Sequence, residues 1–242
     1  IVAAGSGSRV GGEVPKQYRP VRGKPMLRHS YEALSAHPSI SKVYVAIGAG
    51  QEAEASAALR GLPEAIFVQG GATRRESVHL GLKAIATDGG ADRILIHDAA
   101  RPFLPGTVID DLIKALDETP GAVPALPVVD SLSRGDQILS ETVDREHLWR
   151  IQTPQAFAFA DILAAHEIWT GDEATYDARM LNRLSHTQLL RYAGLFTWAV
   201  IGLPLLMLSW WHLGPQPSQR MQLPKRKPET RISLGSSHYP PI

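Results

Sequence analysis

The start of the chain combines a glycine turn with two positive charges. Residues 3–9 read AAGSGSR directly after an apolar run, and Lys16 follows within the sequence PKQY. Glycine lets backbone N–H groups approach an anion closely, while Arg9 and Lys16 supply fixed positive charge. A glycine turn alone is more often a tight connection between two elements. Together with the two cations, this turn predicts a cradle for a triphosphate.

Two common phosphate-binding motifs do not fit the turn. The GxGxxG pattern of dinucleotide-binding proteins requires a third glycine at the position that Val10 occupies. The P-loop requires a lysine directly after Gly12, where Glu13 stands instead. The predicted cradle is therefore of another kind.

A second group of polar residues follows the apolar run RILI at 93–96. His97 and Asp98 come directly after this run, and Arg101 lies three residues beyond Asp98. Carboxylate oxygens suit Mg²⁺, which keeps several waters and bridges substrate phosphates. A single aspartate at the end of a strand is more often a cap of a turn or a helix. The composition of this group keeps both a metal site and a cap open.

The elements that must position these residues follow from the apolar pattern of the first 170 residues. Apolar runs predict strands at 1–4, 42–47, 65–69, 93–97 and 122–129. Between them, apolar residues recur at the i, i+3/i+4 spacing of helices, beginning at Leu27, Val78 and Val108. This alternation predicts an α/β protein, a three-layer sandwich around a mostly parallel, Rossmann-like sheet, with its chemistry at the strand ends.

Composition limits the possible function classes. The 242 residues include no cysteine, which excludes disulfide bonds, a cysteine nucleophile and cysteine-ligated metals. The net charge of +1 argues against a protein that coats nucleic acid. The charge is uneven, because residues 1–190 carry 19 basic and 23 acidic side chains, net −4, whereas residues 191–242 carry 6 and 1, net +5. The chain opens IVAAG with no visible signal peptide, and we expect a few residues to be missing before Ile1.

The last part of the chain is a different kind of sequence. Residues 193–211 form an uncharged segment. As a helix it would span roughly 28 Å, close to the thickness of about 30 Å of a bilayer's hydrocarbon core. We predict a transmembrane helix here, after a linker at 181–192; the alternative is a buried core helix. The proline-rich, basic tail at 212–242 is expected to be disordered.

Several motifs in a fixed order resemble the 2-C-methyl-D-erythritol 4-phosphate cytidylyltransferase family over about residues 1–180. Besides AAGSGSR and PKQY, they are GGATRRESV at 70–78, HDAARP at 97–102, TVDR at 142–145 and QTPQ at 152–155. Some bacteria fuse this enzyme to the following cyclodiphosphate synthase, so the chain also resembles the N-terminal half of such a bifunctional enzyme. The resemblance implies the α/β nucleotidyltransferase fold, a cytoplasmic catalytic domain and isoprenoid precursor biosynthesis by the non-mevalonate route.

The activity implied by the resemblance is the transfer of CMP from CTP to 2-C-methyl-D-erythritol 4-phosphate with release of pyrophosphate. Ribitol 5-phosphate cytidylyltransferases share the same types of motif and are one alternative. A membrane-tethered, catalytically impaired remnant is another. A homodimer is implied as well, because residues 130–150 resemble the protruding arm through which the family dimerises and contributes phosphate contacts to the partner's site. No nucleic-acid partner is expected.

The resemblance also assigns roles to single residues. Arg9 and Lys16 would neutralise the charge that builds on the α-phosphate and the leaving pyrophosphate, and Arg145 would hold the sugar phosphate with its planar fork. Asp98 would hold Mg²⁺, whereas His97 is expected to be structural. The implied CTP contacts are Ala3, Ala4, Gly5, Gly71 and Ser77. The implied contacts to the second substrate are Arg101, Ser131, Thr153 and Thr175.

The chain departs from the family pattern near its C-terminal part. Residues 175–178 read TYDA, where the family has Thr-Asp-(Asp/Glu)-Ala. After Met180 no lysine corresponds to the family's Asn-x-Lys-x-Thr motif, which helps to hold the substrate phosphate. The acidic residue that helps to hold the metal is missing as well. Losing a charged phosphate contact costs about 1.5–3 kcal/mol, so reduced activity is expected.

Overall fold

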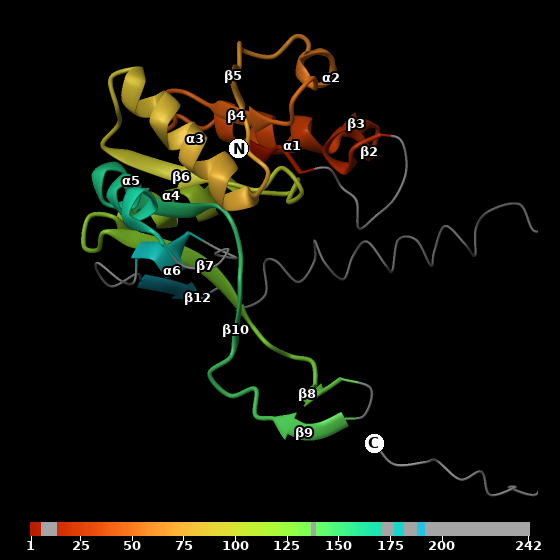
Figure 1. Ribbon diagram of the computed structural model, residues 1–242, viewed down its shortest axis with the longest axis vertical. Coiled ribbons are helices and arrows are strands. Elements are labelled where there is room, and N and C mark those ends of the chain that lie inside the picture. Colours follow the sequence, from red (N-terminus) through yellow and green to blue (C-terminus); the bar gives the residue numbers. More distant parts are fainter. Residues whose placement is uncertain (6–13, 137–138, 171–176, 182–187, 192–242) are drawn as a thin grey trace, which may run out of the picture.

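The computed structural model describes residues 1–5, 14–136, 139–170, 177–181 and 188–191 (Figure 1). Arg9 and Thr175 lie outside the described residues, and so do the predicted transmembrane helix at 193–211 and the basic tail. The roles assigned to them therefore stay predictions. Within the described part of the chain, no helix has the length and apolar character needed to cross a membrane.

The first half of the sheet is parallel, as predicted. Strand β1 (Val2–Ala3) pairs with β4 (Tyr44–Ile47), which pairs with β5 (Ile66–Gln69), and both pairings are parallel. On its other side, β1 meets the end of β6 (Arg93–Ile96). Here the Val2 N–H donates to the His97 carbonyl oxygen at 2.7 Å, and the Ala99 N–H donates to Val2 O at 3.1 Å. The four strands therefore end side by side.

The second half of the sheet contains antiparallel strands that the apolar pattern did not predict. Strand β11 (Gln155–Ala158) runs antiparallel between β6 and β7 (Gly121–Pro127), so β6 and β7 share one direction. Strand β10 (Trp149–Ile151) is antiparallel to β7, and β12 (Gln188–Arg191) is parallel to it. The sheet is thus mostly parallel. Strand β12 lies within the segment that was predicted to be a linker, so the sheet continues beyond residue 180.

Helices cover both faces of the sheet and make three layers (Figure 1). One face packs against α3 (Arg74–Thr87), α5 (Phe159–Ile168) and α6 (Ala178–Leu181) through a core that includes Leu82, Phe157 and Ile162. The other face packs against α1 (Met26–Ser35), α2 (Glu52–Ala58) and α4 (Gly106–Ala115). Neighbouring residues of a strand point to opposite faces. Accordingly, Ala156 belongs to the core under α4 and Phe157 to the core under α3.

Three short elements near the N-terminus and one hairpin complete the fold. A single 3₁₀ turn, η2 (Lys16–Tyr18), precedes the two-stranded ribbon of β2 (Pro20–Val21) and β3 (Lys24–Pro25). Strands β8 (Leu132–Gly135) and β9 (Leu139–Val143) form an antiparallel hairpin that projects away from the body of the protein (Figure 1). This hairpin falls within the predicted arm at 130–150.

Candidate active site

A cavity of about 740 Å³ opens where β1, β4, β5 and β6 end. Parallel α/β sheets commonly bind ligands at the carboxyl ends of their strands. The turns after these four strands and the 3₁₀ turn contribute the walls of this cavity. Its lining includes Ala3, Ala4, Gly5, Lys16, Gln17, Gly48, Ala49, Gly71, Thr73, Arg74, Ser77 and Asp98. The structure therefore brings together all five residues predicted to contact CTP with Lys16 and Asp98.

Gln17 holds the turn at residues 3–5, after β1, in place. Its side chain is 2% exposed, and its amide Nε2 donates to Ala3 O at 2.7 Å and to Gly5 O at 3.0 Å. The neighbouring Tyr18 hydroxyl donates to Gln51 Oε1 at 3.1 Å. These contacts anchor η2 against the end of β1 and place Lys16 at the cavity. No role was predicted for Gln17. Its place beside Lys16 in the PKQY motif was the signal that could have identified it.

A turn at residues 70–73 and the start of α3 form the opposite wall. The Thr73 hydroxyl oxygen accepts from the Glu76 N–H at 3.1 Å, and Glu76 Oε2 accepts from the Ala72 N–H at 2.8 Å, which together cap the helix. The Ser77 hydroxyl donates to Thr73 O at 2.8 Å, and its oxygen accepts from the Gly71 N–H at 3.1 Å. Side chains of this segment therefore hold the wall in place, and the Ser77 hydroxyl links α3 to the turn through Gly71 and Thr73.

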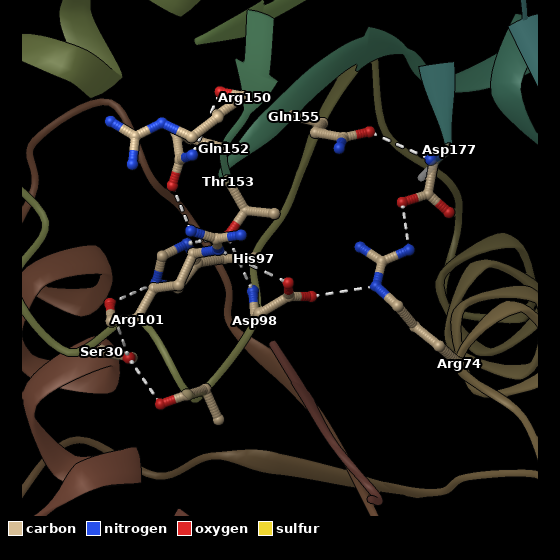
Figure 2. Close-up of polar contacts among 11 residues, drawn as sticks. Ser30, Arg74, His97, Asp98, Arg101, Arg150, Gln152, Thr153, Gln155 and Asp177 are labelled. Carbon is tan, nitrogen blue, oxygen red and sulfur yellow. Dashed lines mark hydrogen bonds and ion pairs between the residues drawn. The ribbon is translucent and has the colours of Figure 1, made fainter. Parts of the chain in front are cut away.

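A chain of hydrogen bonds from His97 through Thr153 holds the main chain at Asp98 (Figure 2). His97 is buried, and burial lowers its pKa to about 4, so the ring is neutral at pH 7. Its Nε2 lies 3.1 Å from Arg101 O, which only accepts, so Nε2 carries the proton and Nδ1 accepts from the Thr153 hydroxyl at 3.1 Å. Thr153 Oγ1 in turn accepts from the Asp98 N–H at 3.1 Å. The predicted structural role of His97 has a physical basis in this chain.

Arginines stand on two sides of the Asp98 carboxylate (Figure 2). Arg74 Nε donates to Asp98 Oδ1 at 3.0 Å, and Arg101 Nε lies 3.6 Å from Asp98 Oδ2. Arg101 also donates through Nη1 to Gln152 Oε1. Arg74 has a second acidic partner, because its Nη1 donates to the buried Asp177 Oδ2 at 2.8 Å. Neither Arg74 nor Asp177 was given a role from the sequence, although Arg74 lies in the motif at 70–78.

The residues around Asp98 fit a magnesium ion that arrives with a triphosphate. Among the described residues, no group of three or more His, Asp or Glu side chains is arranged to hold a metal on its own. Mg²⁺ usually takes one or two carboxylates and completes its shell with waters and substrate phosphates. A single carboxylate, partly exposed at the wall of the cavity, matches that donor set.

Two predicted contacts to the second substrate lie away from this cavity in the same chain. Ser131 and Arg145 are exposed where the projecting hairpin leaves the body, and Arg145 Nη1 donates to Val129 O. Thr153 is 3% exposed and holds the main chain of Asp98, and Arg101 lies beside Asp98, but neither is among the residues that line the cavity. The predicted contacts to the second substrate are therefore divided between the surroundings of Asp98 and the base of the hairpin.

Comparisons with known proteins show which family the chain belongs to. Residues 1–190 match the family model of IspD, 2-C-methyl-D-erythritol 4-phosphate cytidylyltransferase. The chain is 56% identical over 181 residues to the bifunctional enzyme IspD/IspF of Rhizorhabdus wittichii, which covers 74% of this chain and 46% of that protein. It is 44% identical over 178 residues to the 2-C-methyl-D-erythritol 4-phosphate cytidylyltransferase of Cereibacter sphaeroides, covering 72% of this chain and 78% of that protein.

A solved structure shows the same fold. The crystal structure of 2-C-methyl-D-erythritol 4-phosphate cytidylyltransferase from Thermus thermophilus superposes with a TM-score of 0.67 and 30% sequence identity, covering 80% of this chain and 87% of that one. The chain spans about half the length of the bifunctional relatives it matches. The match to the family model extends ten residues beyond the resemblance seen in the motifs, and it includes most of β12. The chain belongs to the IspD family of nucleotidyltransferases.

Proposed function

We propose that the chain transfers CMP from CTP to 2-C-methyl-D-erythritol 4-phosphate and releases pyrophosphate. The observation that carries this proposal is the cavity at the strand ends. It is lined by the turn at 3–5, Lys16, the turn at 70–73 and Asp98. The name of the Cereibacter sphaeroides relative gives the sugar phosphate and the transferred cytidylyl group. The proposal assigns the cavity to CTP.

In this reaction a phosphate oxygen of the sugar phosphate attacks the α-phosphorus of CTP. A new P–O bond forms, and the bond from the α-phosphorus to the bridging oxygen of pyrophosphate breaks, with no covalent enzyme intermediate. Negative charge builds on the phosphoryl oxygens and on the leaving pyrophosphate. Preorganised cations aimed at that charge stabilise the transition state more than the ground state. Lys16, anchored through Gln17 and Tyr18, is suited to this role, and Arg9 is proposed to share it.

The other walls are assigned to the nucleoside and the metal. The turn at 70–73 offers backbone groups and a capped, rigid edge against which a flat base can be held, with Ser77 beneath. Mg²⁺, when bound with CTP, would neutralise part of the triphosphate charge. We propose that Asp98 holds this ion. The hydrogen bond from the Asp98 N–H to Thr153 fixes the main chain from which the carboxylate extends.

We infer that the second substrate is held partly by a partner chain. Ser131 and Arg145 lie at the base of the projecting hairpin and not at the cavity, so their assigned phosphate contacts fit a homodimer in which each hairpin reaches the other site. Mixing two impaired variants, assayed at a sugar phosphate concentration well below the KM of Arg145→Ala, tests this arrangement. In an equal mixture of Lys16→Ala and Arg145→Ala chains, half of the dimers are mixed and each has one intact site, so roughly a quarter of wild-type activity should return. No recovery on mixing and refolding would contradict the shared site.

The experiment that tests the reaction identifies the product. The full chain is incubated with CTP, Mg²⁺ and either 2-C-methyl-D-erythritol 4-phosphate or ribitol 5-phosphate, and the products are analysed by mass spectrometry alongside pyrophosphate release. We expect the cytidine diphosphate derivative of the first sugar only. Product from ribitol 5-phosphate alone would favour the alternative substrate. Absence of pyrophosphate with both would contradict an active enzyme.

A further inference from the structure

Arg74 connects the cavity wall to the interior of the protein. It is the first residue of α3, and its guanidinium donates to Asp98 at the end of β6 and to Asp177 just before α6 (Figure 2). These acids lie 24 and 103 residues away in sequence. Since the guanidinium is a planar fork, bonds from Nε and Nη1 to two different carboxylates fix its direction. A lysine ammonium could not make this bridge with the same geometry.

Asp177 is the inner anchor of this bridge. Its side chain is 1% exposed, and its backbone N–H donates to Gln155 Oε1 at 3.0 Å. His166 Nε2 lies 3.3 Å from Asp177 Oδ1, the oxygen that Arg74 does not bind. Burial favours the neutral acid, but contact with His166 and the charge of Arg74 outweigh it and hold the pKa of Asp177 below its usual range. Asp177 is therefore a fixed, buried anion.

Asp98 is the outer, cavity-facing end of the same bridge. Its side chain is 26% exposed, with Oδ1 bound by Arg74 and Oδ2 at 3.6 Å from the nearest arginine nitrogen that pairs with it. Its main chain is held by Thr153. Because Arg74 is shared with Asp177, its positive charge neutralises Asp98 only in part. Arg74 thus fixes the direction of Asp98 Oδ1, whereas Asp98 Oδ2 has only the longer contact with Arg101.

We propose that Asp177 is a positioning residue for the cytidylyl transfer: through Arg74 it sets the direction of the Asp98 carboxylate and keeps Oδ2 available at the cavity. This inference rests on the proposed function of the cavity. Without the negative charge of Asp177, Arg74 would pair with Asp98 alone. The arginine would then compete with the metal-bound triphosphate for that carboxylate.

The substitution Asp177→Asn tests this role, because it removes the charge while keeping the shape and an accepting oxygen. We expect kcat to fall about tenfold while the KM for CTP changes less than about threefold, since the affected group acts on the reacting phosphates. A second readout does not depend on activity. In ¹⁵N-resolved NMR spectra, the Nε–H of Arg74 should exchange with water at least about fivefold more slowly in the variant, because Arg74 then pairs with Asp98 alone and its Nε–H is held more tightly.

Asp88→Asn is the matched control. Asp88 also joins two elements, through an ion pair with Lys42 at 2.6 Å and a hydrogen bond from the Tyr44 hydroxyl, but it is exposed and lies outside the cavity lining. This variant should leave kcat and the exchange of Arg74 Nε–H unchanged. A tenfold loss of kcat in Asp88→Asn would overturn the proposal, because loss of any ion pair would then have the same effect.

A double variant keeps the test decisive if Asp177→Asn folds poorly. Arg74→Met with Asp177→Asn removes both charges of this ion pair together, which leaves neither partner unpaired. Since Asp177 is proposed to act only through Arg74, the double variant and Arg74→Met should share the same kcat within about twofold. A further loss in the double variant would overturn the proposal, as would wild-type kcat in Asp177→Asn.

A wild-type chain that releases no pyrophosphate would contradict the proposed function instead. In that case the NMR readout still tests the bridge, because unchanged exchange of Arg74 Nε–H in Asp177→Asn would overturn its role.

Discussion

Gly70 packs against Ala4 so closely that a Cβ atom on Gly70 would lie 2.3 Å from the Ala4 Cβ. The two residues belong to opposite walls of the cavity, one in the turn after β5 and the other in the turn after β1. Their contact sets the distance between the wall assigned to the nucleoside and the wall assigned to the phosphates. Glycine at position 70 is therefore required by close approach and not by its backbone angles.

Gly70→Ala should push these walls apart. Overpacking of this kind costs about 1–3 kcal/mol, so we expect CTP affinity to fall about tenfold or more and the melting temperature to drop. Calorimetric titration with CTP measures the first effect. Gly81→Ala is the control, because a Cβ there meets no atom within 4 Å and the position is inside α3, where alanine should raise stability by about 0.5–1 kcal/mol. Wild-type CTP affinity in Gly70→Ala would show that the contact does not shape the site.

Lys16→Ala should lower kcat about 10²-fold with a smaller change in the KM for CTP. The reason is that its charge is proposed to act on the negative charge that develops during transfer. Steady-state kinetics with varied CTP separates the two constants. Lys24→Ala removes a nearby lysine that pairs with Glu32 on the surface at 2.8 Å, and it should behave as wild type. An effect on KM alone would remove Lys16 from the assigned role.

Arg145→Ala should raise the KM for the sugar phosphate at least about tenfold and leave CTP binding nearly intact, because its fork is assigned to the phosphate of the second substrate. The matched control is Arg134→Ala, since Arg134 belongs to the same hairpin and pairs loosely with Glu141 at 4.0 Å. Varying the sugar phosphate at saturating CTP gives the constant directly. If the two arginine variants have the same KM, Arg145 does not contact the substrate.

Acid stability should depend on Asp177. Its pKa in the folded chain lies below the usual value of 3.8, so the unfolded chain binds more protons over that interval. The stabilisation it gives is complete above the unfolded pKa and is lost as the pH falls through the lower folded value. Urea denaturation between about pH 5 and about pH 2.5 should therefore show a shallower loss of stability in Asp177→Asn than in the wild type. Parallel curves would mean that Asp177 is not ionised in the folded chain.

Much of the fold could be predicted from the sequence because its central strands are apolar runs with clear ends. The predicted strands at 42–47, 65–69 and 93–97 correspond to β4, β5 and β6 within two residues. Strand β11 escaped prediction because its sequence, QAFA, is too short for a periodic signal and its direction depends on neighbours that are distant in sequence. Helix α2, EAEASAA, likewise has no apolar stripe of large side chains.

The candidate site also has a part that local sequence predicts and a part that depends on contacts between distant residues. Asp98 and the glycine turns lie in contiguous motifs directly after strands, and Lys16 follows the first of these turns in the next motif, so strand ends and motif order were enough to predict this part of the site. The bridge from Asp98 through Arg74 to Asp177 joins residues from three separate elements. Nothing in local spacing distinguishes an arginine that bridges two acids from an arginine at a solvated helix start. Only the packing of α3, β6 and α6 around one core makes that distinction.

A crystal structure of the full chain with CTP and Mg²⁺ would show directly how the cavity holds the nucleotide. We expect the triphosphate against the turn at 3–5 with the α-phosphate within reach of Lys16 Nζ, the base against the turn at 70–73, and the metal at Asp98. CTP bound elsewhere on the chain, or bound in this cavity with its base at Lys16 and its phosphates at residues 70–73, would contradict the proposed assignment of the cavity.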